Sequence, residues 1–176
     1  MKKYIAALLT ALLLLCTALS AGAVGPALTT TEAYCIIDAD TGLVLAQQNM
    51  NEELHPASIT KVMTLLLAFE AVHDGRLTME TPVPVSEHAY HMGGSQIWLE
   101  PGEHFTLDEM IKAICVSSAN DAAVAVAELV GGSEPAFVEQ MNARAASLGM
   151  EQTSFRNACG LDAEGHVSSA YDIALM

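Results

Sequence analysis

The chain has 176 residues and a formal net charge of −14, from 21 acidic and 7 basic side chains. That length is typical of a single domain. A surface this acidic repels phosphate backbones and anionic lipid headgroups, so the composition argues against nucleic acid as a partner.

The first 23 residues have the pattern of a secretory signal peptide. A short basic start is followed by an apolar run over residues 5–19 and by an A-x-A processing site at Ala21-Gly22-Ala23. The run is shorter than the roughly 20 apolar residues of a membrane span. Cys16 does not fit a lipoprotein site, because the large Leu15 precedes it where a small residue is expected. We therefore predict an exported protein.

Removal of residues 1–23 takes away two lysines and no acid, so the mature part carries a net charge of −16. Three cysteines remain, Cys35, Cys115 and Cys159. An odd number in an exported protein does not form a disulfide framework, and the spacing favours no particular pair. Cys115 lies in an apolar helical stretch, where we expect a buried and inert thiol.

The mature part begins with an expected linker over residues 24–31, VGPALTTT. Two β-branched and apolar runs follow, at 33–38 and 43–47, and they predict a β-hairpin. Gly42 lies between them and supplies the positive φ that a hairpin turn needs. A largely buried helix is predicted from just after Pro56 to about residue 73.

Residues 76–105 are expected to be mostly loop, and the sole tryptophan, Trp98, is expected to pack beneath it. The interrupting residues are Pro82, Pro84, Gly93, Gly94, Pro101 and Gly102. Three helices are then predicted. The first opens with a capping box and covers about 106–116, the second covers about 119–130, and the third runs from 133 to 149.

The first chemical signal is the pair Ser58 and Lys61, within HPASITKVMT. The plain alternative is a helix-capping serine and a solvated lysine, since Ser-x-x-Lys alone is a weak pattern. Lys61, however, faces the positive end of a helix dipole and precedes an apolar run. A desolvated lysine shifts toward its neutral form and can act as a base. At this spacing it can activate Ser58 as a nucleophile, and the helix N-terminus can stabilise the oxyanion.

The second signal is Ser118-Ala119-Asn120, sixty residues after Ser58. Alone, Ser118 or Asn120 could simply be the N-cap of the following helix. Together, Ser-x-x-K and a Ser-x-Asn element form two parts of a three-part signature shared by penicillin-binding proteins and class A β-lactamases. The third part of that signature is Lys-Thr-Gly.

The chain resembles the bacterial D-alanyl-D-alanine carboxypeptidases, the low-molecular-weight, serine-type penicillin-binding protein family. The resemblance covers about residues 32–176. It is carried by AYCIIDADTGLVLAQQN, PASITKVMT, GGSQIWLEPGEHFTLDEMIKAICVSSANDAAVAVAE and LGMEQTSFRNACGLDAEGHVSSAYDIALM. It implies an α+β fold of the β-lactamase/transpeptidase-like type, with residues 32–176 as the N-terminal hairpin and helical part of the catalytic domain.

The resemblance also implies a role for each motif residue. Ser58 would be the acylated nucleophile and Lys61 its base. Ser118 would relay a proton to the leaving D-alanine, and Asn120 would bind the substrate's peptide backbone. The implied reaction removes the terminal D-alanine from the stem pentapeptide of peptidoglycan, and β-lactam antibiotics would inhibit it by acylating the same serine. Neither a cofactor nor a metal is implied.

One departure from the family pattern is that Lys-Thr-Gly is absent, and no lysine follows Lys112. The last predicted helix begins near Ser169, and the sequence ends one turn later. We therefore expect a truncated catalytic domain that lacks the later strands of the sheet, the later C-terminal domain and its membrane anchor. A polypeptide of this length is expected to fold poorly and to be inactive, since the hairpin would have open edges.

Other interpretations remain open. A class A-like serine β-lactamase would prefer Asp where Ala119 stands and would carry a later E-x-x-L-N stretch. A non-catalytic exported module that binds peptidoglycan or a partner would account for the missing third motif. His88 and His91 have i, i+3 spacing but no third metal ligand nearby in sequence. Asp121 is expected to favour the helix dipole in the first turn rather than to act in catalysis.

Overall fold

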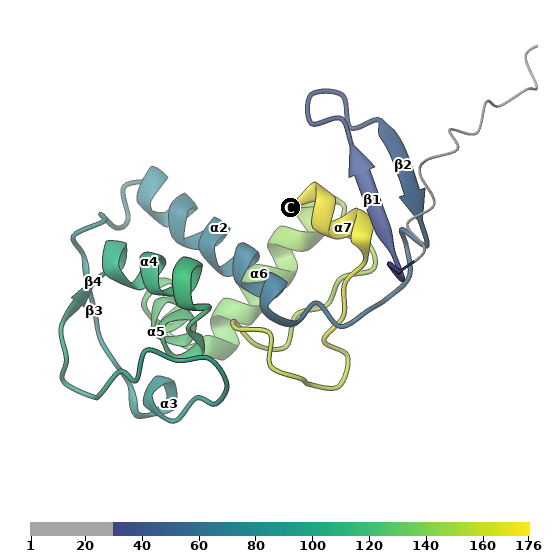
Figure 1. Ribbon diagram of the computed structural model, residues 1–176. Coiled ribbons are helices and arrows are strands. Elements are labelled where there is room, and N and C mark those ends of the chain that lie inside the picture. The colour runs from purple at the N-terminus through teal and green to yellow at the C-terminus, as the bar shows by residue number, and fades with distance from the viewer. Residues whose placement is uncertain (1–29) are drawn as a thin grey trace, which may run out of the picture.

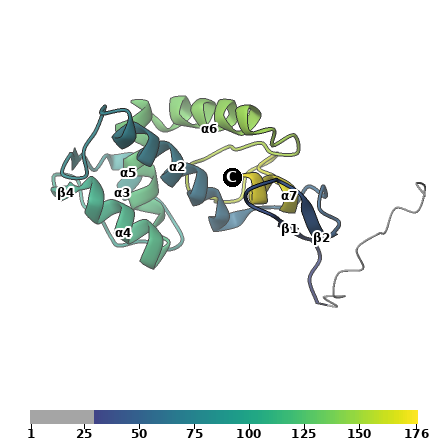
Figure 2. The same cartoon turned by 90° about the horizontal axis from the view of Figure 1, so that it is seen from above.

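The computed structural model describes residues 30–176, so the expected signal peptide, Cys16 and most of the linker at 24–31 lie outside the described residues. In chain order the elements are β1 (Tyr34–Ile37), β2 (Val44–Gln48), the 3₁₀ turn η1 (Ala57–Ile59), α2 (Thr60–His73), β3 (Pro82–Val83), α3 (Glu87–Tyr90), β4 (Phe105–Thr106), α4 (Leu107–Ser117), α5 (Asn120–Gly131), α6 (Glu134–Leu148) and α7 (Ala170–Leu175). Helices α2 to α5 gather toward one end of the molecule, α6 extends from beside α5 toward α7, and the β1–β2 hairpin lies beside α7 at the other end (Figures 1 and 2). The predicted α+β composition is confirmed.

The predicted β-hairpin is present. Strands β1 and β2 pair antiparallel, with Tyr34 opposite Gln48 and a register shift between Ile36 and Ile37. Gly42 adopts φ 70° and its N–H donates to the Asp38 carbonyl, 2.8 Å away. The positive φ expected from glycine at the turn is therefore confirmed. A second antiparallel pair, β3–β4, lies within the segment predicted to be mostly loop.

Helix α5 is the centre of the helical part. Every side chain from Asn120 to Ala127 is buried, and α5 contacts α2, α3, α4 and α6. Four of these positions are alanine, and small side chains allow neighbouring helices to approach closely on every side. A helix that is apolar all round is expected to be buried in this way. Because Ser118 and Asn120 stand at the start of α5, this central packing also positions the second motif.

The predicted boundaries of α4, α5 and α6 agree with the structure to within one residue, whereas α2 begins at Thr60, after the 3₁₀ turn η1. The capping box of α4 is present: Thr106 Oγ1 accepts from the Glu109 N–H, and the Glu109 carboxylate accepts from the Thr106 N–H. Helices α5 and α6 end at Gly132 and Gly149, both in the left-handed region. Local capping signals were therefore sufficient to place these helices.

Three burial predictions were wrong. Helix α2 is buried on one face only, since Val62 and Phe69 are about half exposed. The Cys115 side chain lies on the outer face of α4 and is exposed rather than buried. Trp98 is 77% exposed, with φ 61°, rather than packed beneath its loop. Apolar composition does not reveal which side of a helix or loop meets a neighbouring element, and these residues face away from the core.

The segment after α6 runs back across the molecule and is tied down at several points. Ser154 and Val167 form an antiparallel bridge, and Leu54 pairs with Ser168. The fully buried Asp172 of α7 accepts hydrogen bonds from Thr153 Oγ1, at 2.7 Å, and from the Gln152 N–H. These contacts tie the segment between α6 and α7 to itself, to α7 and to Leu54, which precedes η1. Within residues 30–176, no helix is long and apolar enough to cross a membrane.

Candidate active site

Ser58 lies in the 3₁₀ turn η1, immediately before α2, and its side chain is exposed. Neither η1 nor α2 has a side-chain N-cap hydrogen bond, so the interpretation of Ser58 as a simple helix cap is wrong. The preceding residue, Ala57, has φ 46°. A non-glycine residue in that region is strained, and such strain persists where the surrounding structure holds it. The backbone therefore presents the Ser58 hydroxyl outward at the start of a helix.

Lys61 is only 4% exposed, which excludes the solvated-lysine alternative. Its Nζ donates to Cys159 O at 2.7 Å and to Ser58 Oγ at 3.3 Å. Burial lowers the pKa of Lys61, and the neighbouring Cys159 opposes that shift in part. A lysine whose pKa is lowered loses its proton more easily, and once neutral, within reach of a serine hydroxyl, it can take the proton of that hydroxyl.

The second motif lies on a different element. Ser118 is the C-cap of α4, half-buried, in the left-handed conformation with φ 52° and ψ 36°. Helix α5 has no side-chain N-cap, so neither Ser118 nor Asn120 acts as the cap that the plain alternative required. In the part of the chain that the structure describes, neither residue forms a hydrogen bond with Ser58 or Lys61.

Asn120 instead joins the start of α5 to the glycine-rich loop at 93–95. Its side-chain Nδ2 donates to Gly93 O, and its backbone N–H donates to Ser95 O, both at 2.7 Å. A Cβ at Gly94 would lie 2.7 Å from Asn120 Nδ2, so glycine is required for this close approach. The loop and the Ser-x-Asn element therefore form one structural unit.

Asp121 completes this attachment. Its fully buried carboxylate accepts from the N–H groups of Ile97 and Leu99, each at 3.1 Å to Oδ2, and from its neighbour Ala122. Because the N–H groups on both sides of Trp98 are bound, that residue bulges outward with its indole in solvent. Asp121 does lie in the first turn of α5, as predicted, but its main contacts anchor the loop.

The loop at 157–160 forms the other side of the Lys61 environment, and sequence reasoning missed it. Thr64 Oγ1 donates to Ala158 O at 2.6 Å, while Lys61 donates to Cys159 O. Gly160, with φ 88°, packs so closely on η1 that a Cβ there would lie 1.8 Å from Ala57 O. An asparagine three residues before a glycine is typical of a tight turn, but that pattern does not predict its partner.

His166 was also missed. It is 2% exposed, and its Nδ1 accepts from the Arg156 N–H at 3.2 Å. The proton of the neutral ring is therefore on Nε2, which donates to Thr60 Oγ1 at 2.8 Å. Burial lowers the pKa of His166, with further contributions from Arg156 and His55. This buried pair fixes the first residue of α2, directly before Lys61.

The two histidines weighed as metal ligands have other partners. His88 Nε2 lies 2.6 Å from Glu134 Oε2, and His91 Nε2 lies 3.5 Å from a carboxylate oxygen of Glu87. Over residues 30–176 there is no group of three or more His, Cys, Asp or Glu side chains that could hold a metal ion.

A serine and a buried lysine at the start of one helix, in an α+β scaffold, define the class of penicillin-binding proteins and related serine enzymes. The chain belongs to the D-alanyl-D-alanine carboxypeptidase family, Peptidase S11, which it matches over residues 21–176. It is 50% identical to D-alanyl-D-alanine carboxypeptidase DacF of Bacillus subtilis, over 100% of this chain and 47% of that protein.

Solved structures show the same relationship. The crystal structure of carboxypeptidase DacD from Francisella tularensis matches with a TM-score of 0.80 and 34% identity, over 83% of this chain and 35% of that one. Penicillin-Binding Protein D2 from Listeria monocytogenes, in its ampicillin-bound form, matches with a TM-score of 0.71 and 27% identity, over 82% of this chain and 58% of that one. The chain spans about half the length of the Bacillus subtilis relative.

Proposed function

We propose that the complete protein is an exported, serine-type D-Ala-D-Ala carboxypeptidase that acts on the stem peptides of peptidoglycan. The observation that carries this proposal is the amine of Lys61, buried and 3.3 Å from Ser58 Oγ at the start of α2. The membership of the chain in this family supports the choice of substrate class.

In the proposed reaction, neutral Lys61 takes the proton of Ser58, and Ser58 Oγ attacks the carbonyl carbon of the penultimate D-alanine. The peptide bond to the terminal D-alanine then breaks, and its nitrogen leaves with a proton relayed through Ser118. Backbone N–H groups at the start of α2 stabilise the oxyanion. Water then hydrolyses the ester, which frees Ser58 and leaves a shortened stem peptide.

The other contacts of the substrate follow from the second motif. Asn120 would bind the peptide backbone of the stem, and its hydrogen bond with Gly93 O occupies only one of the two N–H groups of its side-chain amide. A β-lactam presents a strained amide to the same serine and would acylate Ser58. The similarity to a penicillin-binding protein solved with ampicillin supports this second expectation.

The test is covalent labelling of the complete gene product with a fluorescent penicillin, together with release of D-alanine from a pentapeptide. We expect Ser58→Ala to abolish labelling, and Lys61→Ala to lower D-alanine release by several orders of magnitude, roughly as for other activated nucleophiles. Labelling that survives Ser58→Ala would remove this residue from the nucleophile role. Retained release in Lys61→Ala would place the base elsewhere.

Two alternatives predict different outcomes in the same experiment. A β-lactamase would hydrolyse the penicillin rapidly and would release no D-alanine. A non-catalytic module would neither label nor release D-alanine, yet would still bind peptidoglycan. That residues 24–176 alone are inactive, for want of Lys-Thr-Gly, stays a prediction, and D-alanine release by that segment would contradict it.

A further inference from the structure

We propose that Asn157 is a positioning residue for the catalytic base: its side chain shapes the loop whose Cys159 carbonyl holds Lys61 in place beside Ser58. This inference rests on the proposed function of Lys61 as that base. It assigns a role to a residue outside the signature motifs, 96 positions after Lys61 in the chain.

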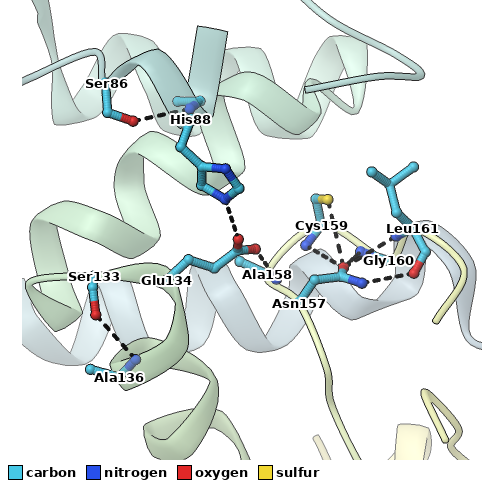
Figure 3. A network of polar contacts seen from close by, with 11 residues as sticks. Ser86, His88, Ser133, Glu134, Ala136, Asn157, Ala158, Cys159, Gly160 and Leu161 are labelled. Carbon is cyan, nitrogen blue, oxygen red and sulfur yellow. Dashed lines mark hydrogen bonds and ion pairs between the residues drawn. The ribbon is translucent and has the colours of Figure 1, made fainter. Parts of the chain in front are cut away.

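The side chain of Asn157 binds nearly all of the loop that follows it. Its Oδ1 accepts from three successive backbone N–H groups, those of Cys159 at 3.2 Å, Gly160 at 2.7 Å and Leu161 at 3.2 Å. Its Nδ2 donates to Leu161 O at 2.7 Å. Figure 3 shows these bonds converging on the one amide group. Asn157 therefore determines which way these peptide groups point.

Ala158, which lies between Asn157 and Cys159, is held from a second direction. Glu134, at the start of α6, accepts the Ala158 N–H on Oε1 at 2.9 Å, and its other oxygen pairs with His88 (Figure 3). Thr64 of α2 donates to Ala158 O. The N–H groups of Ala158 and Cys159 thus bind Glu134 and Asn157, while both carbonyls receive donors from α2.

This arrangement has a direct consequence for Lys61. One of its N–H groups is bound to Cys159 O at 2.7 Å, the shorter of its two hydrogen bonds. The anchored amine is then held next to Ser58 Oγ rather than free to rotate about four side-chain bonds. A carbonyl acceptor also favours the charged form of the amine, which opposes the effect of burial. Loss of the carbonyl should therefore change both the position of the amine and its titration.

The experiment compares Asn157→Leu with Asn157→Asp in the complete gene product. Leucine removes every hydrogen bond of the side chain at similar volume, whereas aspartate keeps an acceptor for the three N–H groups. We measure the rate constant of acylation by a fluorescent penicillin across pH, per folded molecule. We expect a loss of about 10²-fold for Asn157→Leu, the scale of a misplacement of about 1 Å. Asn157→Asp should acylate within about tenfold of the wild-type rate at high pH. Its acid limb, the fall in rate at low pH as the base becomes protonated, should move to higher pH, because a carboxylate favours the charged amine.

The matched control is Asn142→Leu. Asn142 binds the N–H and C=O of Phe155, two residues before Asn157 in the same segment. Among the described residues it makes no hydrogen bond to residues 157–161. It should lower stability without changing the acylation rate or the acid limb of the folded enzyme. An Asn157→Leu variant that behaves like this control, with reduced stability alone, would overturn the proposal.

A second measurement separates this proposal from the proposed function. The titration of Lys61 is followed by NMR of ¹³C-labelled lysine. The signal of Lys61 is identified because it disappears in Lys61→Met. Asn157→Leu should lower the pKa of Lys61, and Asn142→Leu should leave it unchanged. If penicillin fails to label the wild type at Ser58, the proposed function fails, and the NMR titration still decides whether Asn157 controls the amine. An unchanged titration in Asn157→Leu would refute that control.

Discussion

Gly160→Ala tests how the position of η1, which carries Ser58, depends on the 157–160 loop. An alanine Cβ would lie 1.8 Å from Ala57 O, whereas real Cβ contacts stay above 3.0 Å, so the two backbones must separate by at least 1.2 Å. The left-handed φ of 88° adds roughly 1–2 kcal/mol, and overpacking adds about 1–3 kcal/mol. Because Ala57 directly precedes Ser58, that separation displaces the nucleophile. We expect acylation to fall about 10²-fold.

The assay is urea unfolding of the complete protein, combined with the rate constant of acylation by a fluorescent penicillin. Gly75→Ala is the matched control, since Gly75 has φ 72° but nothing within 4 Å of a built Cβ. It should lose roughly 1–2 kcal/mol through backbone strain alone and keep its acylation rate. The reasoning is refuted if Gly160→Ala matches Gly75→Ala in stability and acylates at the wild-type rate.

Three further predictions concern other residues of the chain. Asp121→Ala leaves three backbone N–H groups without their acceptor and should lower the free energy of unfolding by about 3–5 kcal/mol; a loss below about 1 kcal/mol in urea unfolding would contradict this. Because the pKa of His166 is lowered in the folded state, stability should fall as pH drops below about 6.5, where the unfolded chain takes up the proton first. His166→Gln should flatten that dependence between pH 5 and 7.5, and an equal slope in both proteins would count against it. Iodoacetamide should modify exposed Cys115 in the native protein, whereas Cys159, buried and with a raised pKa, should react only on unfolding, as mass spectrometry of the peptides will show.

Sequence patterns were sufficient where the cause was local. The hairpin follows from a glycine between two β-branched runs, and α4 follows from a capping box four residues long. The pairing of Ser58 with Lys61 was also predictable, because residues at i, i+3 in helical turns lie on one face. In each case the interacting groups are close in the chain, so their spacing carries the geometry.

The exposure of single apolar residues was not predictable in the same way. Cys115 and Trp98 were expected inside, and both are outside. An apolar residue is buried only if another element packs against its face, and composition alone does not say where that element lies. The position of Trp98 depends on Asp121, whose carboxylate binds the backbone on both sides of it from 22 to 24 residues away.

The sequence by itself determined the family, the hairpin, the longer helices and the pairing of Ser58 with Lys61, but not the short elements β3, α3 and β4. Only the tertiary structure decided what surrounds Lys61: the Cys159 carbonyl, 98 residues away, and the Asn157 side chain that shapes its loop. A backbone carbonyl that accepts a side-chain hydrogen bond leaves no trace in residue identity, since every residue carries the same carbonyl. Lys61 could be predicted to act as a base from its neighbours in the chain, but the contact that holds it exists only after the loop between α6 and α7 has folded back onto α2.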